Sequence, residues 1–393
     1  MKRHLLDEER LITSLMEKKV KIIGTYENMR TYRKKLRKTY LDRFPTLTDP
    51  RLETRLKTAR AVPIEPFQGA IPLGKSFSDA DEMKEWAASV LNGKVIVGVD
   101  GSQVYVTSDF NIPVGLARAG AFWIQYGSEQ STYGSDSLSE DYVGAGALEN
   151  IEDGEPMRQI NVDKRRLALE IKLASQIVKK FVEAKAPTYL MMDTPLILRY
   201  IRWADDKVKR AMCQSMTQLL DVCEQYRVPL VGYTDYSLAR DLTPVIETFL
   251  RERAALPVSD IAVIAPLLEE AGFGARTPVF RIRHRLLEKF YGRHRNELGF
   301  FYQKVHSDLP VRMEFPLWAH RLGEIQELAE VVAAQSVLGE GYPYVLLRAH
   351  ETAILEADDR DRFYDLISRF LSKECGVPFR ETAKAKLKRL SIA

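Results

Sequence analysis

A short apolar run that ends in an acid constrains the fold of this chain more than any other feature. Residues 95–99 read Val-Ile-Val-Gly-Val and are followed directly by Asp100. A continuous apolar run of this length is typical of a strand that is buried on both faces of a sheet. A second run, Tyr-Leu-Met-Met at 189–192, is followed by Asp193 in the same way. Both runs therefore predict central strands that carry an aspartate at the rim of a sheet.

Helical and extended patterns alternate around these two strands. Further strands are expected at about 116–126, 228–233, 279–283, 299–305 and 311–315, and helices at about 162–184, 206–226, 320–338 and 344–357. This alternation predicts an α/β fold, with a mixed sheet flanked by helices. The stretch 127–157 holds eight acids, many Gly and Ser, and neither Lys nor Arg, so we expect it to be a mobile surface loop.

The N-terminal region is expected to form a basic helical arm. Residues 1–60 hold 17 Lys/Arg against 8 Asp/Glu and carry +9, whereas the other 333 residues hold 41 against 46 and carry −5. Within the arm, Met29, Tyr32, Leu36 and Tyr40 recur at helical spacing, and basic residues crowd the opposite face. The arm could grip DNA, or its charges could be the solvated face of a dimerisation helix.

Cysteine usage and hydropathy bear on the compartment. The three cysteines show neither a metal-binding nor a disulfide spacing, no apolar run approaches ~18 residues, and no charged-then-apolar leader opens the sequence. We therefore expect a cytoplasmic protein that makes no membrane contact.

The helix between the two strand-end acids carries a third acid in an unusual place. On a helical projection, Glu170 falls at the edge of the apolar stripe, whereas Glu183 falls on the solvated side. A carboxylate held against a core is costly unless it is paired or binds a cation. Asp100, Glu170 and Asp193 together suit a hard divalent ion, Mn²⁺ or Mg²⁺, and a pair of such ions can drive phosphodiester hydrolysis.

Simpler explanations exist for each of these acids. A strand-end aspartate is commonly a turn or capping residue, and Glu170 could be neutralised by Arg165 or Arg166 nearby. His350 lies on the apolar face of the last predicted helix, where a lone histidine is commonly a core residue. It gains a role only if the fold brings it to the acids, because imidazole can bind Mn²⁺ or move protons.

Residues 69–76 match a phosphate-binding loop, GxxxxGK[ST], letter for letter. Such a loop requires a buried strand before it and a helix that starts at its Lys-Ser. Pro63 and Pro66 make a central strand before Gly69 improbable, and the next helix has its own cap at Ser78. A P-loop ATPase is therefore the weakest of the functions considered.

Five segments, taken in order, resemble the NurA family of nucleases. They are 97–102 (VGVDGS), 165–170 (RRLALE), 190–196 (LMMDTPL), 310–316 (PVRMEFP) and 341–350, which contains GYPY and a final Ala-His. The resemblance covers roughly residues 90–360, and the order of the motifs is more specific than any one of them.

The resemblance implies an RNase H-like nuclease core that uses manganese. It implies an endonuclease on single-stranded DNA and a 5′→3′ exonuclease, a homodimer that docks on a hexameric HerA-type ATPase, and a role in end resection and repair. Carried over by residue, Asp100, Glu170 and Asp193 would bind the metal, for which we expect two ions, with Asp100 bridging and His350 completing the site. Thr194 stands where the family usually has Gly, and Asp235, after the strand ending at Tyr233, becomes a reserve ligand.

We divide the chain accordingly into a basic helical arm (1–60), a Pro-containing linker with a short helix (61–93), a NurA-like nuclease domain (94–360) and a C-terminal helical tail (361–393). DNA phosphates would be held by Arg118, Arg165 and Arg166. Tyr342 and Tyr344 would stack on unpaired bases, or else pack in the core. A non-catalytic DNA clamp or ATPase adaptor that uses the acids structurally remains the main alternative.

Overall fold

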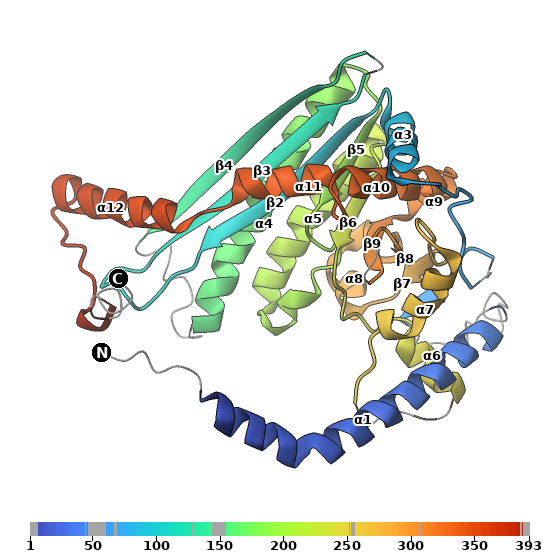
Figure 1. Cartoon of the computed structure of the whole chain (residues 1–393). Coiled ribbons are helices and arrows are strands. Elements are labelled where there is room, and N and C mark those ends of the chain that lie inside the picture. Colours follow the sequence, from blue (N-terminus) through green and yellow to red (C-terminus); the bar gives the residue numbers. More distant parts are fainter. Residues whose placement is uncertain are drawn as a thin grey trace.

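One mixed sheet runs through the protein, and the predicted site residues lie on its strands, just after them, or on helices packed against it (Figure 1). The computed structural model describes residues 7–43, 45, 60–66, 69–127, 129–143, 155–250, 252, 256–306, 309–385 and 387. The nine strands in these residues are β1 (Ala61–Pro63), β2 (Val95–Val104), β3 (Val114–Gln125), β4 (Thr132–Val143), β5 (Thr188–Met192), β6 (Leu230–Thr234), β7 (Phe280–Ile282), β8 (Leu298–Gln303) and β9 (Val311–Pro316).

Helices surround this sheet. They are α1 (Glu8–Arg43), α3 (Ala80–Leu91), α4 (Glu155–Glu183), α5 (Asp206–Tyr226), α6 (Thr243–Leu250), α7 (Ile261–Ala271), α8 (Arg285–Phe290), α9 (Leu317–Arg321), α10 (Ile325–Leu338), α11 (Tyr344–Ala353) and α12 (Ala357–Glu374). Two 3₁₀ turns, η4 (Arg199–Trp203) and η5 (Gly292–Asn296), complete the set. The described residues contain no helix that is long and apolar enough to cross a membrane.

The strand order identifies the fold. The sheet runs β1-β7-β8-β9-β6-β5-β2-β3-β4. From β4 to β6 it has the RNase H-like order, in which β2, β3 and β4 form an antiparallel meander and β5 and β6 run parallel to β2. The predicted α/β fold with an RNase H-like mixed sheet is therefore confirmed, and the further strands extend it beyond β6.

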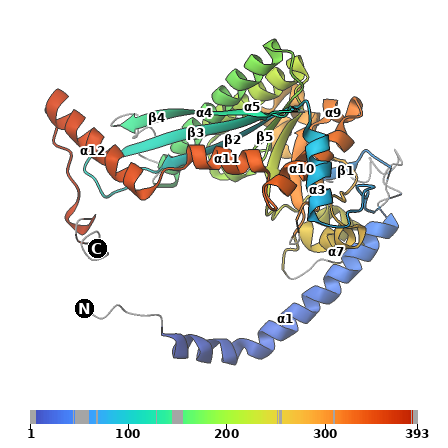
Figure 2. The same cartoon turned by 45° about the horizontal axis from the view of Figure 1, so that its top comes forward.

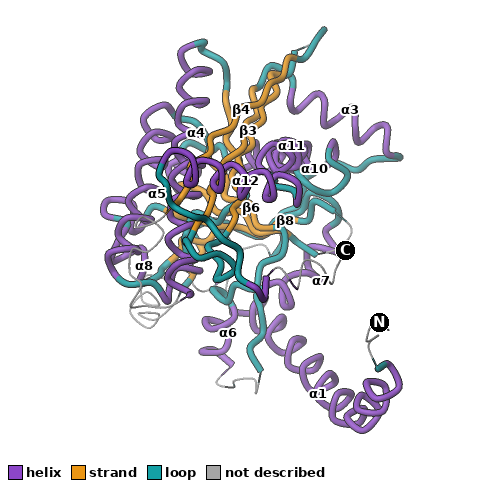
Figure 3. Tube along the Cα trace, turned by 90° about the vertical axis from the view of Figure 1, so that its left-hand side faces the viewer, coloured by secondary structure: helices purple, strands orange, loops and turns teal. Residues whose placement is uncertain are grey.

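Each face of the sheet is covered by its own helices. Figure 3 shows the strands between α4 and α5 on one side and α3, α10 and α11 on the other. Side chains alternate along β2, so that Val95, Val97 and Val99 enter the core under α4 while Ile96 enters the core under α10 and α11. This alternation decides on which face each functional residue of β2 lies.

Two glycines let α11 approach the sheet closely. A Cβ atom at Gly98 would lie 2.3 Å from the carbonyl oxygen of Val345, and one at Gly120 would lie 2.5 Å from the backbone nitrogen of Ala353. Any larger residue would push α11 away from β2 and β3. The close approach places His350 of α11 directly above Asp100 in β2.

The helix α1 is attached to the body by only one of its halves. Tyr32, Leu36 and Tyr40 are buried, as the predicted apolar face requires, and this part of α1 contacts α6 and α7. The N-terminal half extends away from the rest of the protein (Figure 2). An amphipathic helix normally buries its apolar side, so the extended half presents a face without a partner among the described residues.

Two expectations from the sequence are corrected. Residues 132–143, expected within a loop, form the edge strand β4, which pairs with β3 along its whole length; polar composition hid it because an edge strand tolerates charge, and residues 144–154 lie outside the described part. The helix expected over 320–338 is two helices, α9 and α10, separated where Gly323 adopts φ +78°.

Candidate active site

The predicted acids lie at one edge of the sheet. Asp100 lies within β2, Asp193 directly follows β5 and Asp235 directly follows β6. Because β2, β5 and β6 are parallel, these positions share an edge, and the backbone nitrogen of Asp193 donates to the carbonyl of Val99 at 3.1 Å. Carboxyl ends of parallel strands are where α/β sheets usually carry their binding sites.

Asp100 and His350 are in direct contact although 250 positions separate them. The Nδ1 atom of His350 lies 2.7 Å from Oδ2 of Asp100, and the backbone nitrogen of Gly101 donates to Oδ1 of Asp100 at 2.6 Å. Asp100 is buried, whereas the His350 side chain is 52% exposed. An imidazole that gives Nδ1–H to a carboxylate keeps the lone pair of Nε2 available to a metal or a proton.

Asp193 lies on the same side of the sheet as Asp100. Its carboxylate accepts a hydrogen bond from the phenol of Tyr342, whose ring meets that of Tyr233 edge-on with centroids 5.2 Å apart. Burial and the charge of Asp100 raise the pKa of Asp193 to about 6, although Tyr342 and His350 act in the opposite direction. A buried carboxylate whose pKa is raised by a neighbouring acid in this way is typical of sites that bind cations.

Glu170 approaches the same part of β2 from the other face. A Cβ atom at Gly101 would lie 2.1 Å from Oε1 of Glu170, so the acid rests against this glycine from the α4 side. The Arg166 guanidinium pairs with Oε1, whereas Oε2 is buried and has no hydrogen-bond partner among the described residues. Burial raises the pKa of Glu170 to about 7; Arg166 lowers it, and Asp100 and Asp193 raise it further.

The four predicted ligands therefore form two groups separated by the backbone of β2. Asp100, Asp193 and His350 lie on the α11 side, and Glu170 lies on the α4 side beside Gly101. They suit a divalent cation by chemistry, because they supply carboxylate oxygens, one imidazole nitrogen and the unpaired Glu170 oxygen. Glu170 also pairs with Arg166, which is the neutralisation that we considered as an alternative to metal binding.

The residues proposed to bind DNA are partly engaged with the protein. Arg165 pairs with Glu140 on β4, and Arg166 pairs with Glu170. Arg118 lies on β3 opposite Ser102, next to the site. The ring of Tyr344 meets that of Phe122 edge-on at 6.2 Å. The hydrogen bond from Tyr342 to Asp193 is a role that the sequence did not suggest, since no spacing rule links the two.

Comparison with protein families decides the relationship of the chain. A model of the NurA domain matches residues 94–354, two thirds of the sequence. The chain belongs to the NurA family. The resemblance drawn from five short motifs is thereby confirmed, and all five motifs lie within the matched range.

Comparison with solved structures gives distant similarities, and comparison with curated proteins gives no match. A crystal structure of NurA bound to dAMP and manganese is 12% identical, covers 92% of this chain and 97% of its own, and has a TM-score of 0.38. A crystal structure of NurA is 12% identical, with coverages of 70% and 88% and a TM-score of 0.40. Endonuclease V from Ciona intestinalis, in complex with a 24mer DNA, is 11% identical, with coverages of 73% and 96% and a TM-score of 0.29.

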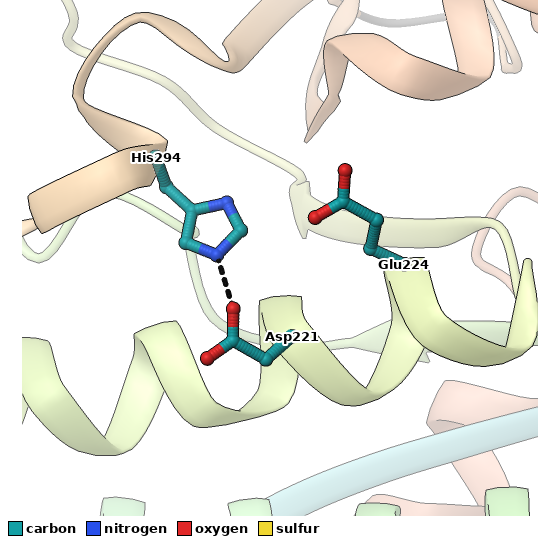
Figure 4. Close-up of side chains that lie close together, drawn as sticks. All are labelled: Asp221, Glu224 and His294. Carbon is teal, nitrogen blue, oxygen red and sulfur yellow. Dashed lines mark hydrogen bonds and ion pairs between the residues drawn. The ribbon is translucent and has the colours of Figure 1, made fainter.

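A different cluster of this NurA-family protein also resembles a metal site. Asp221, Glu224 and His294 bring ligand atoms within 4.8 Å of one another, the only group of three His, Cys, Asp or Glu to do so in the described part of the chain (Figure 4). Nε2 of His294 lies 2.7 Å from Asp221, and Arg293 pairs with both carboxylates. Since a guanidinium already neutralises the two acids, we interpret the cluster as an ion-pair link between α5 and η5.

The P-loop motif does not have the surroundings that nucleotide binding requires. The preceding strand, β1, lies at the outer edge of the sheet and pairs with β7 alone. No helix begins at Lys75 or Ser76; α3 begins at Ala80, with Asp79 as its N-cap. Without a helix N-terminus at its Lys-Ser, the loop offers no cradle for phosphates.

Proposed function

We propose that this NurA-family protein is a metal-dependent DNA nuclease with Asp100, Glu170, Asp193 and His350 as its catalytic centre. The observation that carries the proposal is the contact between Asp100 and His350 at 2.7 Å, made beside Asp193 at the edge of the sheet. A structural aspartate would need no half-exposed histidine brought to it from an element 250 positions away. An acid–imidazole pair at a rim is suited to ligand binding and proton transfer.

Manganese is the proposed cofactor, with magnesium as the substitute, in one or two ions. Asp100, Asp193 and His350 would hold it on the α11 side, and the unpaired Glu170 oxygen would contribute from the α4 side. A divalent cation supplies activation of water and stabilisation of the leaving oxygen of a phosphodiester. Oxygen-rich donor sets with a single imidazole favour Mn²⁺ over softer metals.

The protein's own residues position these groups. Tyr342 holds Asp193 by a hydrogen bond, and Asp100 orients the His350 ring through Nδ1, which leaves Nε2 to accept or give a proton. Arg166 compensates the buried charge of Glu170. Each contact fixes a charged group before substrate arrives, which is how preorganised sites lower a barrier.

DNA is the proposed substrate, held through its backbone. Arg118 is adjacent to the acids. Arg165 and Arg166 lie on α4, where each pairs with a carboxylate; if each exchanged that carboxylate for a DNA phosphate, both could bind the strand. Tyr344, half-buried above β3, would contact bases. Phosphate contacts of this kind make affinity fall steeply with salt.

The finer activities are proposed from the family: an endonuclease on single-stranded DNA and a 5′→3′ exonuclease that acts in end resection with a hexameric HerA-type ATPase. A homodimer is supported by the extended half of α1. Its apolar side chains lie exposed on one side of the helix: Leu11, Ile12, Leu15, Met16, Val20, Ile22, Ile23 and Tyr26. An exposed apolar face of this length is typical of an association surface.

One observation favours a second candidate, a non-catalytic DNA clamp or ATPase adaptor. Arg166 already neutralises Glu170, and the described acids at the rim do not bring three ligand atoms within 4.8 Å of one another. Calorimetry with Mn²⁺ separates the two. The nuclease binds the ion and loses that binding in Glu170→Gln and Asp193→Asn, whereas the adaptor binds none or is indifferent to both changes.

The activity is tested with single-stranded and duplex DNA labelled at the 5′ or the 3′ end, with Mn²⁺ or with EDTA. We expect degradation only with Mn²⁺, and short products from the 5′-labelled strand if cleavage proceeds from that end. Intact DNA in every Mn²⁺ reaction would contradict the nuclease and leave the clamp.

A further inference from the structure

A hollow beside the acids has no role in the function proposed so far. It has a volume of about 390 Å³ and lies between the start of α3, the end of β8 and the end of α10. Its walls include four apolar side chains, Met83, Phe273, Val305 and Val337, together with His306 and Gly341. In Figure 2, α3 crosses α10 on this face of the sheet, and the two helices pack together.

The hollow adjoins the candidate active site. Strand β8 is parallel to β6, because both are antiparallel to β9, so the end of β8 lies at the same edge as Asp235. His306, just beyond β8, has its Nε2 atom 3.4 Å from Oδ1 of Asp235. A Cβ atom at Gly341 would lie 3.3 Å from His306, and the next residue, Tyr342, hydrogen-bonds Asp193. A wall residue of the hollow, Gly341, is therefore directly followed in the sequence by a hydrogen-bond partner of one of the acids.

The lining suits a flat, largely apolar ligand with polar edges. The Phe273 ring is fixed by edge-on contacts with Phe77 and Trp86, at centroid distances of 6.1 and 6.2 Å, and such contacts hold a ring in one orientation. Exposed Lys84 and Glu340 stand at the rim and can meet hydrogen-bonding groups. Pockets of about 300–1,000 Å³ with this mixture of apolar walls and few polar groups are typical of small-ligand sites.

We propose that the hollow is a subsite for one unpaired nucleobase of the strand that is cut at the acids. This inference rests on the proposed nuclease function and adds a source of substrate selectivity to it. Unpaired bases are held by stacking on aromatic and apolar surfaces. A base in a duplex is stacked and paired, and must be flipped out at a cost before it can enter a side pocket. The subsite therefore favours single strands over duplex.

Abasic substitution locates the subsite. Single-stranded oligonucleotides, each with one abasic position, are tested with the full-length protein for binding by fluorescence anisotropy in Ca²⁺ and for cleavage in Mn²⁺. We expect one position, at a constant distance from the cut, where loss of the base weakens binding by about tenfold. In Phe273→Ala and Met83→Glu, intact DNA should bind about tenfold more weakly, and the abasic penalty at that position should disappear. Phe370→Ala, an exposed aromatic on α12 that is 56% accessible, is the matched control and should keep the penalty.

Each outcome decides. Loss of the abasic penalty in both pocket variants and its retention in Phe370→Ala support the subsite. An equal penalty at every position, or pocket variants that keep the wild-type penalty, overturn it. If the wild type never cleaves DNA, the proposed nuclease fails, while the anisotropy measurements still decide on the base subsite.

Discussion

Gly101 is the residue at which β2 meets the acid of α4. A Cβ atom there would lie 2.1 Å from Oε1 of Glu170 and 2.8 Å from Cγ of Arg166. We expect Gly101→Ala to displace Glu170 and to lower the free energy of unfolding by roughly 1–3 kcal/mol, as overpacking does. Urea denaturation measures the change. Gly24→Ala is the control: no atom lies within 4 Å of its Cβ position in α1, so it should stabilise the helix. Two variants of equal stability would contradict the tight contact.

Glu170 and Asp193 should make the metal-free protein less stable as pH rises. Burial raises the pKa of Glu170 to about 7 and that of Asp193 to about 6, whereas both titrate near pH 4 in an unfolded chain. Between roughly pH 4 and 7 the folded state therefore binds more protons, so the free energy of unfolding falls as pH rises through this window.

The variant Glu170→Gln tests this sign. At pH 8 without metal its Tm should exceed that of the wild type, its pH dependence between 5 and 8 should be weaker, and added Mn²⁺ should raise its Tm less. Glu183→Gln, at an exposed position of the same helix, should behave as the wild type in all three respects. A Tm gain from Mn²⁺ that is equal in Glu170→Gln and wild type would remove Glu170 from the metal site.

At the scale of single residues, the sequence predicted the identity of the site residues better than it predicted the contacts between them. Asp100, Asp193 and His350 lie together where β5 ends beside β2, although Asp100 is not at a strand end, because β2 continues to Val104. Glu170 lies on the opposite face of β2 because α4 covers that face. The alternation of side chains along β2 could not predict this until the helices covering each face were known. The bond from Tyr342 to Asp193 depends on how the turn before α11 packs, which no local pattern encodes.

Among the elements, β9 carries a buried charge network that attaches it to the rest of the sheet. Arg312 is 1% exposed and lies 2.8 Å from Asp241 and 3.0 Å from Glu314, with its guanidinium 3.8 Å from the centroid of the Phe300 ring. Arg199 of η4 pairs with the same two acids at 2.8 and 3.2 Å. Removal of one buried partner leaves charges without compensation, which is far costlier than loss of a surface pair.

We expect Arg312→Met to lower the free energy of unfolding by about 3–5 kcal/mol. Arg321→Met removes a comparable contact, 2.7 Å to Glu297, at an exposed position and should cost no more than about 1 kcal/mol. Chemical denaturation followed by circular dichroism compares the two. Equal losses of unfolding free energy in the two variants would mean that burial does not make the ion pairs of Arg312 more important for stability.

The elements predicted best from the sequence are those with a strong period. Helix α5 (Asp206–Tyr226) has the expected bounds, and β5 and β9 lie within a residue or so of theirs. Strand β2 instead continues to Val104, four residues beyond the end expected at Asp100. The region of α6 and α7 was left without assignment, because Pro266 lies inside α7 and α6 has only eight residues. Strand β4 was missed because its backbone pairing with β3, rather than an apolar pattern, defines it.

For the whole molecule, the charge asymmetry corresponds to a structural division. The +9 segment includes α1, which is attached by Tyr32, Leu36 and Tyr40, while its N-terminal half extends into solvent (Figure 1). If a second copy covers this half, Leu15→Glu and Val20→Glu should weaken the dimer at least about tenfold, because each places a charge in an apolar contact. Light scattering across protein concentrations measures the change.

Asn28→Glu adds the same charge on the polar side of α1 and should leave the dimer intact. Dimers of equal strength in all variants would place the interface elsewhere; a monomeric wild type would contradict the homodimer itself.

The central claim is that Asp100, and not the tighter-looking cluster at Asp221, is the centre of a metal-dependent nuclease. The most direct measurement is the rate of single-stranded DNA cleavage in Mn²⁺ by wild type, Asp100→Asn and Asp221→Asn, each confirmed to be folded. Loss of a residue outside the first ligand shell usually costs ~10–100-fold, so loss of a ligand should cost more. We predict a loss greater than about 100-fold in Asp100→Asn and near-wild-type cleavage in Asp221→Asn. Full activity in Asp100→Asn, or its loss in Asp221→Asn alone, would contradict the account.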